Sequence, residues 1–96
     1  NCYIESHERP REGAARLGSS IRHMHFKDLL IDQNKWTPVL TGEGNFALQE
    51  VQVALQQINY QGFVSFEWEK KWHPEIPDAT VALPHFARWW RENSAR

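Results

Sequence analysis

Apolar and polar positions alternate in two short stretches of the chain. Residues 21–27, IRHMHFK, place His23, His25 and Lys27 on one face, with Met24 and Phe26 on the other. Residues 63–68, FVSFEW, alternate in the same way. Alternation with a period of two is typical of a β-strand that buries one face. We therefore expect strands over residues 21–27 and 63–68.

Three helices are expected around these strands, over residues 8–18, 48–58 and 81–92. The first has a Pro in its first turn and ends at a Gly, positions that suit these residues. In the other two, apolar residues recur at helical spacing and form one side of each helix. These residues are Leu48, Val51, Leu55 and Ile58 in the second helix, and Leu83, Phe86, Ala87 and Trp90 in the third. Residues 28–45, with the turn Gly42-Glu43-Gly44, are expected to form a long loop.

The order helix, strand, helix, strand, helix predicts an α/β fold. Strands that are joined through a helix are normally parallel, with a right-handed connection. Two parallel strands alone would leave both sheet edges open and could not bury the helices well. We therefore expect part of an α/β sheet, and the first residue, an Asn and not a Met, also suggests a piece of something longer.

Composition indicates an ordinary globular chain of one domain at most. Of the 96 residues, 41% are hydrophobic and 24% are charged. The 11 basic and 12 acidic residues give a net charge of −1, so nucleic acid is disfavoured as a partner. No apolar run approaches a membrane span, and no signal peptide is evident. The single cysteine, Cys2, cannot form an internal disulfide, and a cytoplasmic location without membrane contact is expected.

His25 and Glu67 are the candidate site residues that the pattern itself suggests. Both lie late in their expected strands, and ligands of α/β sheets gather outside the carboxyl ends of the strands. An imidazole and a carboxylate are normal ligands of Mn²⁺, Mg²⁺, Co²⁺ or Zn²⁺. Two ligands are too few for a stable site, so others would have to come from outside these residues. Taken alone, an HxH pattern on a strand is more often an exposed polar face.

Three motifs in this order, RHMHFKD, TGEGNF and YQGFVSFEWE, resemble the C-terminal part of the sugar phosphate isomerase/epimerase group, which has a xylose isomerase-like barrel. The resemblance extends from about residue 16 to residue 90. It implies a (β/α)₈ TIM barrel, of which residues 1–96 would form approximately strands 7 and 8 with their helices. One departure from the family pattern is Ala47, which stands where many relatives have an Asp that can cap the following helix.

The resemblance also implies roles for single residues. His25 matches the family's metal-ligating histidine, and Glu67 matches its final carboxylate ligand. In the epimerases this Glu is also one of two acid/base carboxylates that move a proton next to a carbonyl through an enediolate. The partner Glu and a metal-ligating Asp lie on earlier strands in the family. His23, Lys27 and Glu69 would contact substrate or support the ligands, although Lys27 could equally serve only to neutralise carboxylates at the rim.

The function implied is that of a divalent-metal-dependent isomerase or epimerase acting on a small carbohydrate or polyol. The remaining barrel strands would be the partners of this chain, and the 96 residues alone are expected to be inactive. One alternative is an inosose dehydratase-like lyase, which also begins by abstracting a proton next to a carbonyl. Others are an abasic-site endonuclease-like barrel, which the near-neutral charge disfavours, and a non-catalytic remnant.

Overall fold

A computed structural model describes residues 2–94, apart from the side chain of Cys2, so the expectation about its thiol lies outside the described part. The helices are α1 (Cys2–Ser6), α2 (Pro10–Leu17), the 3₁₀ turn η1 (Gly18–Ser20), α3 (Leu48–Gln57) and α4 (Ala79–Ser94). The strands are β1 (Met24–Phe26), β2 (Asp28–Asp32), β3 (Lys35–Val39) and β4 (Val64–Phe66). Of these elements, α1, η1, β2 and β3 were not expected.

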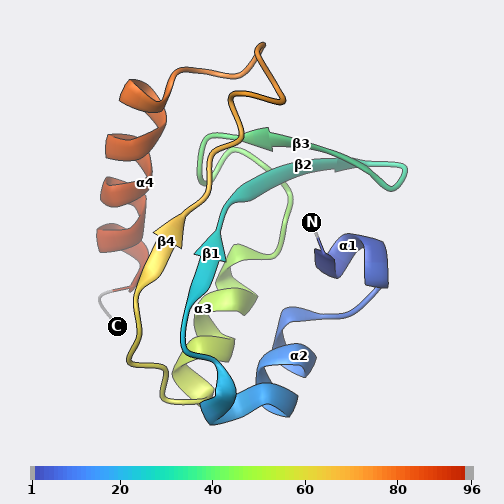
Figure 1. Cartoon of the computed structure of the whole chain (residues 1–96), viewed down its shortest axis with the longest axis vertical. Helices are drawn as coiled ribbons and strands as arrows, with labels where there is room; N and C mark the ends of the chain where they lie inside the picture. The colour runs from blue at the N-terminus through green and yellow to red at the C-terminus, as the bar shows by residue number, and fades with distance from the viewer. Residues whose placement is uncertain (1, 95–96) are drawn as a thin grey trace.

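Strands β1 and β4 lie side by side and run in the same direction, as predicted (Figure 1). Residues 24–26 pair with residues 64–66, and α3 makes the connection between the two strands. Both strands are shorter than the predicted ranges, because only three residues of each take part in the pairing. His23 therefore lies just before β1, while Lys27 and Glu67 lie just after β1 and β4.

One face of this sheet is covered by an aromatic cluster from α4. Phe26 is 3% exposed, and its ring centroid lies 5.7 Å from that of Phe86 and 5.2 Å from that of Trp90. Phe66 stacks on Phe86 at 4.7 Å. Such aromatic contacts add to the free energy gained by burying apolar area. The apolar face is thus fixed against α4, and the polar side chains of both strands are left to the opposite face.

The prediction that Leu83 belongs to the buried side of α4 is wrong. Leu83 is 51% exposed, whereas the adjacent Ala82 is 1% exposed. Ala82, Phe86 and Trp90 are spaced by four residues and therefore follow one side of the helix. Ala82 therefore takes the place on the buried side that was predicted for Leu83, and Leu83 lies on the exposed side.

The predicted long loop over residues 28–45 is wrong in its first part, where β2 and β3 form an antiparallel hairpin. Gln33 and Asn34 both have positive φ, 49° and 67°, as in the two-residue turns that match the twist of paired strands. Gln-Asn is a weaker turn signal than Asn-Gly. Pro38 also argued against a strand, but it lies in β3, which pairs only with β2.

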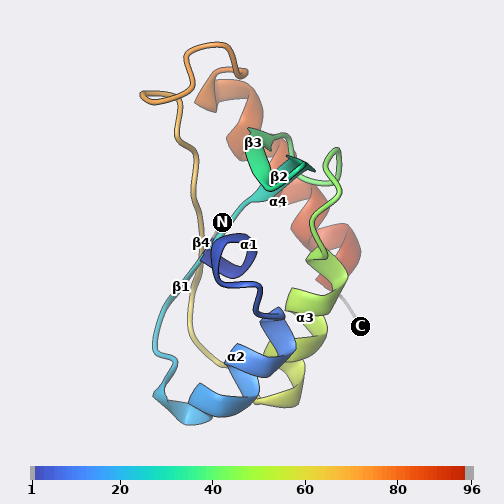
Figure 2. The same cartoon turned by 90° about the vertical axis from the view of Figure 1, so that its right-hand side faces the viewer.

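Helices α2 and α3 lie where they were expected. α2 packs on α3 at the end where β1 begins, and the hairpin lies at the opposite end (Figures 1 and 2). The connection from β4 to α4 also lies at the hairpin end (Figure 1). Asn59 has a φ of 53°, the left-handed conformation expected where α3 ends. Within residues 2–94, no helix is both long and apolar enough to cross a bilayer.

The N-terminus of α3 has no side-chain cap. Ala47 occupies the cap position and makes no side-chain hydrogen bond to the first turn. Glu50 is the third residue of the helix, and a Ser three residues before a Glu would form a capping box. The carboxylate of Glu50 is already paired with Arg9, so a Ser at position 47 would act on this turn mainly through its own hydroxyl.

Ala47→Ser should therefore stabilise the fold. We expect the free energy of unfolding to rise by about 0.5–1 kcal/mol, because the hydroxyl would accept a hydrogen bond from an unpaired backbone N–H of the first turn. Urea unfolding measures this change. Gln49→Ser is the matched control, since it adds the same side chain two residues later, where it cannot cap. An equal gain in both variants would contradict this account.

Candidate functional site

His25 and Glu67 project from the same face of neighbouring strands. His25 pairs with Ser65, so Glu67 lies two residues further along, and its N–H donates to the carbonyl of Phe26 at 2.9 Å. His25, Glu67 and Lys27 all line one cavity of about 320 Å³, whose other walls are mostly apolar. The sequence pattern placed His25 and Glu67 at corresponding positions of their strands. The observed register places Glu67 two residues nearer the carboxyl ends than His25.

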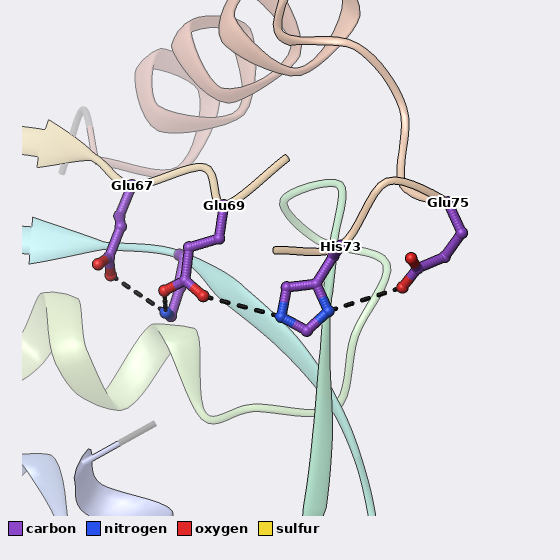
Figure 3. A network of polar contacts seen from close by, with 5 residues as sticks. Glu67, Glu69, His73 and Glu75 are labelled. Atoms are coloured by element: carbon purple, nitrogen blue, oxygen red, sulfur yellow. Dashed lines mark hydrogen bonds and ion pairs between the residues drawn. The ribbon is translucent and has the colours of Figure 1, made fainter. Parts of the chain in front are cut away.

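Lys27 is a buried cation held between the carboxylates of Glu67 and Glu69, both labelled in Figure 3. Its side chain is only 5% exposed. Its ammonium lies 3.2 Å from Oε2 of Glu67, donates a hydrogen bond to Oε1 of Glu69, and stands 4.8 Å above the ring of Trp36. A buried charge is tolerated only when it is paired. Lys27 therefore ties the end of β1 to the segment after β4 and neutralises carboxylates there.

The same network continues outward through an imidazole (Figure 3). Nε2 of His73 lies 3.8 Å from Oε2 of Glu69, and Nδ1 of His73 lies 3.6 Å from Oε1 of Glu75. These separations are too long for hydrogen bonds, so the groups interact as charges when His73 is protonated. His73 and Glu75 were not predicted as site residues, because their irregular segment has no periodicity that would indicate a shared face.

Two imidazoles and a hydroxyl form the other part of the polar face. Nε2 of His23 lies 2.9 Å from Oγ of Ser65. The ring of His23 meets the ring of His25 at 5.3 Å in a T-shaped arrangement. His23 was predicted to lie near the ligands, whereas Ser65 was only placed on the face by alternation.

Asp28 fixes the turn beside the site, a role that sequence reasoning missed. Its carboxylate is buried and accepts hydrogen bonds from the backbone N–H groups of Leu29, Gly42 and Gly44, at 2.8, 2.9 and 2.9 Å. A Cβ on Gly44 would overlap the carbonyl oxygen of Leu29, and one on Gly42 would lie 2.8 Å from Nε1 of Trp89. The two glycines are therefore required for this close approach.

The donor atoms available for a metal are the imidazole of His25 and the carboxylate of Glu67. This pair suits a divalent ion chemically. Residues 2–94 contain no group of three or more His, Cys, Asp or Glu side chains that could hold a metal. The described chain thus offers part of a ligand set, which other strands of a barrel would have to complete.

The comparisons with known proteins address the fold. A family model described as a xylose isomerase-like TIM barrel matches residues 1–93, almost the whole chain. The resemblance predicted from the three motifs is confirmed, and so is the α/β barrel fold class. Neither a curated protein nor a solved structure matches the chain.

Replacing Lys27 with Met should leave two carboxylates without their common cation. We expect a loss of about 1–3 kcal/mol in the free energy of unfolding, less than for a fully buried pair because water partly screens both carboxylates. Urea unfolding of Lys27→Met measures the loss. Lys35→Met, at the exposed tip of the hairpin, is the control and should change little. Equal losses in the two variants would be inconsistent with a paired, buried Lys27.

Burial raises the pKa of Asp28 above its ordinary value of 3.8, against the opposing effect of three N–H donors, and Glu43 adds to the rise. Because the folded pKa lies above the unfolded one, the contribution of Asp28 to stability is fully present below pH 3.8. That contribution is lost as the pH rises through the raised pKa.

Asp28→Asn tests this linkage. In place of one carboxyl oxygen the amide carries an NH₂ group, which cannot accept a hydrogen bond from a backbone N–H, so we expect a loss of about 1–3 kcal/mol in stability. The difference from the wild type should be largest below pH 3.8 and should shrink as the pH rises. Urea unfolding at a series of pH values measures both effects, with the exposed Asp32→Asn as control. A difference that grows with rising pH would show that the sign is wrong.

Proposed function

The chain belongs to the xylose isomerase-like TIM barrel family, and from this premise we propose that it forms part of a divalent-metal-dependent carbohydrate isomerase or epimerase. The observation that supports this proposal is the cavity at the ends of β1 and β4, where His25, Lys27 and Glu67 meet. In TIM barrels, the active site lies at the carboxyl ends of the strands. His25, Lys27 and Glu67 of this chain lie at that end.

His25 and Glu67 would hold the metal, with further ligands from other strands of the barrel. A bound Mn²⁺, Mg²⁺, Co²⁺ or Zn²⁺ ion would act as a Lewis acid that polarises the carbonyl of the substrate. Oε2 of Glu67 faces Lys27, so Oε1 would hold the metal, and the second lone pair of Oε2 would remain for proton transfer.

Glu67 would also be the base of the reaction. Its carboxylate takes the proton from the carbon next to the carbonyl, and the electron pair of that C–H bond moves toward the carbonyl oxygen to give an enediolate. A second carboxylate, on another strand, would return a proton to the opposite face or to the neighbouring carbon. Lys27 holds Glu67 in place, and the apolar walls of the cavity limit the access of water.

A small ketose, polyol or hydroxy-carbonyl compound is the proposed substrate class. The 11 basic and 12 acidic residues give a net charge of −1, which provides no basic surface for a DNA backbone. An endonuclease-like activity is therefore the weaker candidate. A dehydratase would share the proton abstraction by Glu67 and differ in the loss of water that follows.

Glu67→Gln tests the base in a complete barrel that carries this chain. Gln keeps the shape of Glu but cannot accept the proton, so exchange of the substrate C–H with deuterated water should fall by about 100-fold or more. Proton NMR of a ketose panel measures the exchange and also detects any dehydration product.

Glu75→Gln is the matched control, because Glu75 is 62% exposed and lies at the far end of the same network. Its exchange rate should stay within about twofold of the wild type. Undiminished exchange in Glu67→Gln would refute the proposed role of Glu67. Metal analysis that found three ions per barrel, where we expect one, would favour the endonuclease.

A further inference from the structure

We propose that Ser65 and His23 are positioning residues, which orient the imidazole of His25 toward the metal. This inference rests on the proposed function, because it takes His25 to be a ligand. It concerns the side of the polar face away from Lys27. The ammonium of Lys27 holds Glu67 in place through an ion pair. The imidazole of His25 has no such ion pair among the described residues, so another contact has to orient it.

A side-chain hydrogen bond links Ser65 of β4 to His23, just before β1. Ser65 lies directly opposite His25 in the register of β1 and β4. Its hydroxyl nevertheless contacts the diagonal neighbour, Nε2 of His23, at 2.9 Å. A hydroxyl can donate to this nitrogen or accept from it, so the bond holds the ring of His23 in either neutral tautomer. Ser65 thereby fixes a ring that lies outside the paired residues.

The rings of His23 and His25 are in contact. The ring planes of His23 and His25 meet at 89°, with centroids 5.3 Å apart. Within residues 2–94, neither ring nitrogen of His25 forms a hydrogen bond, so both remain available to a ligand. An exposed imidazole without hydrogen bonds would otherwise rotate, and fixing it on binding would cost conformational entropy. The contact with His23 limits that rotation beforehand.

The orientation of His25 differs from that of most metal-binding histidines. Such a histidine is normally oriented by a hydrogen bond from its second nitrogen, and removal of that partner lowers metal affinity by about 10–100-fold. Here the orienting contact is a neighbouring ring, which is in turn held by Ser65. The effect passes in series from Ser65 through His23 to His25, so the contributions of Ser65 and His23 should not add.

The test is the dissociation constant for Co²⁺, measured by titration on the complete barrel that carries this chain. We expect His25→Ala to weaken binding by about 100-fold or more, and His23→Ala and Ser65→Ala by about 10-fold each. The double variant of His23 and Ser65 should bind no more weakly than His23→Ala alone. Ser65→Thr, which keeps the hydroxyl, should restore most of the affinity. Ser20→Ala, an exposed Ser outside the strands, is the matched control.

Nitrogen NMR of the histidine side chains gives a readout that does not depend on metal. In the wild type, the ring signals of His25 should report one restricted orientation, and in Ser65→Ala they should become averaged. His23→Phe keeps the ring contact but loses the hydrogen bond, so it should bind Co²⁺ more tightly than His23→Ala and remains informative if the latter folds poorly.

Two outcomes separate this inference from the proposed function. If His25→Ala loses Co²⁺ while Ser65→Ala and His23→Ala bind like the wild type, the positioning role is wrong and the proposed metal site stands. If His25→Ala also binds like the wild type, His25 is not a ligand, and the proposed metal site falls together with this inference.

Discussion

The parallel pairing of β1 with β4 is the constraint on which the other features depend. Residues 24–26 face residues 64–66, and this register sets which side chains share a face. A slip by one residue would turn every side chain of one strand to the other face. Phe26 and Phe66 oppose such a slip, because both rings contact Phe86 on α4. The aromatic cluster thus fixes the face on which His25 and Glu67 lie.

The polar face has two parts with different physical character. Around His25 the neighbours are His23 and Ser65. The ring of His23 contacts the ring of His25, and the hydroxyl of Ser65 is hydrogen-bonded to His23. Around Glu67 the environment is ionic and is dominated by the buried ammonium of Lys27. In the proposed reaction this division separates the side that only holds the metal from the side that also moves a proton. Asp28 keeps the nearby turn in place by accepting backbone hydrogen bonds.

Regular periodicity made much of this structure predictable. Alternation gave the two strands and their polar face. Helical spacing gave two helices, and Pro10 with Gly18 gave a third, all close to their observed bounds. The hairpin was missed because Gln33 and Asn34 are an uncommon pair for a tight turn, and because Pro38 reads as a strand breaker. Tertiary contacts could not be predicted from periodicity. The burial of Asp28 and the diagonal hydrogen bond of Ser65 depend on which segments lie close together in space.

The central claim is that His25 and Glu67 act on one metal ion at the ends of these strands. A double-mutant cycle on Co²⁺ affinity, with His25→Ala and Glu67→Gln, tests it most directly in the complete barrel. Two ligands of one ion are coupled, so the double variant should bind only slightly more weakly than the worse single variant. Fully additive losses would mean that His25 and Glu67 act independently, and would contradict the account.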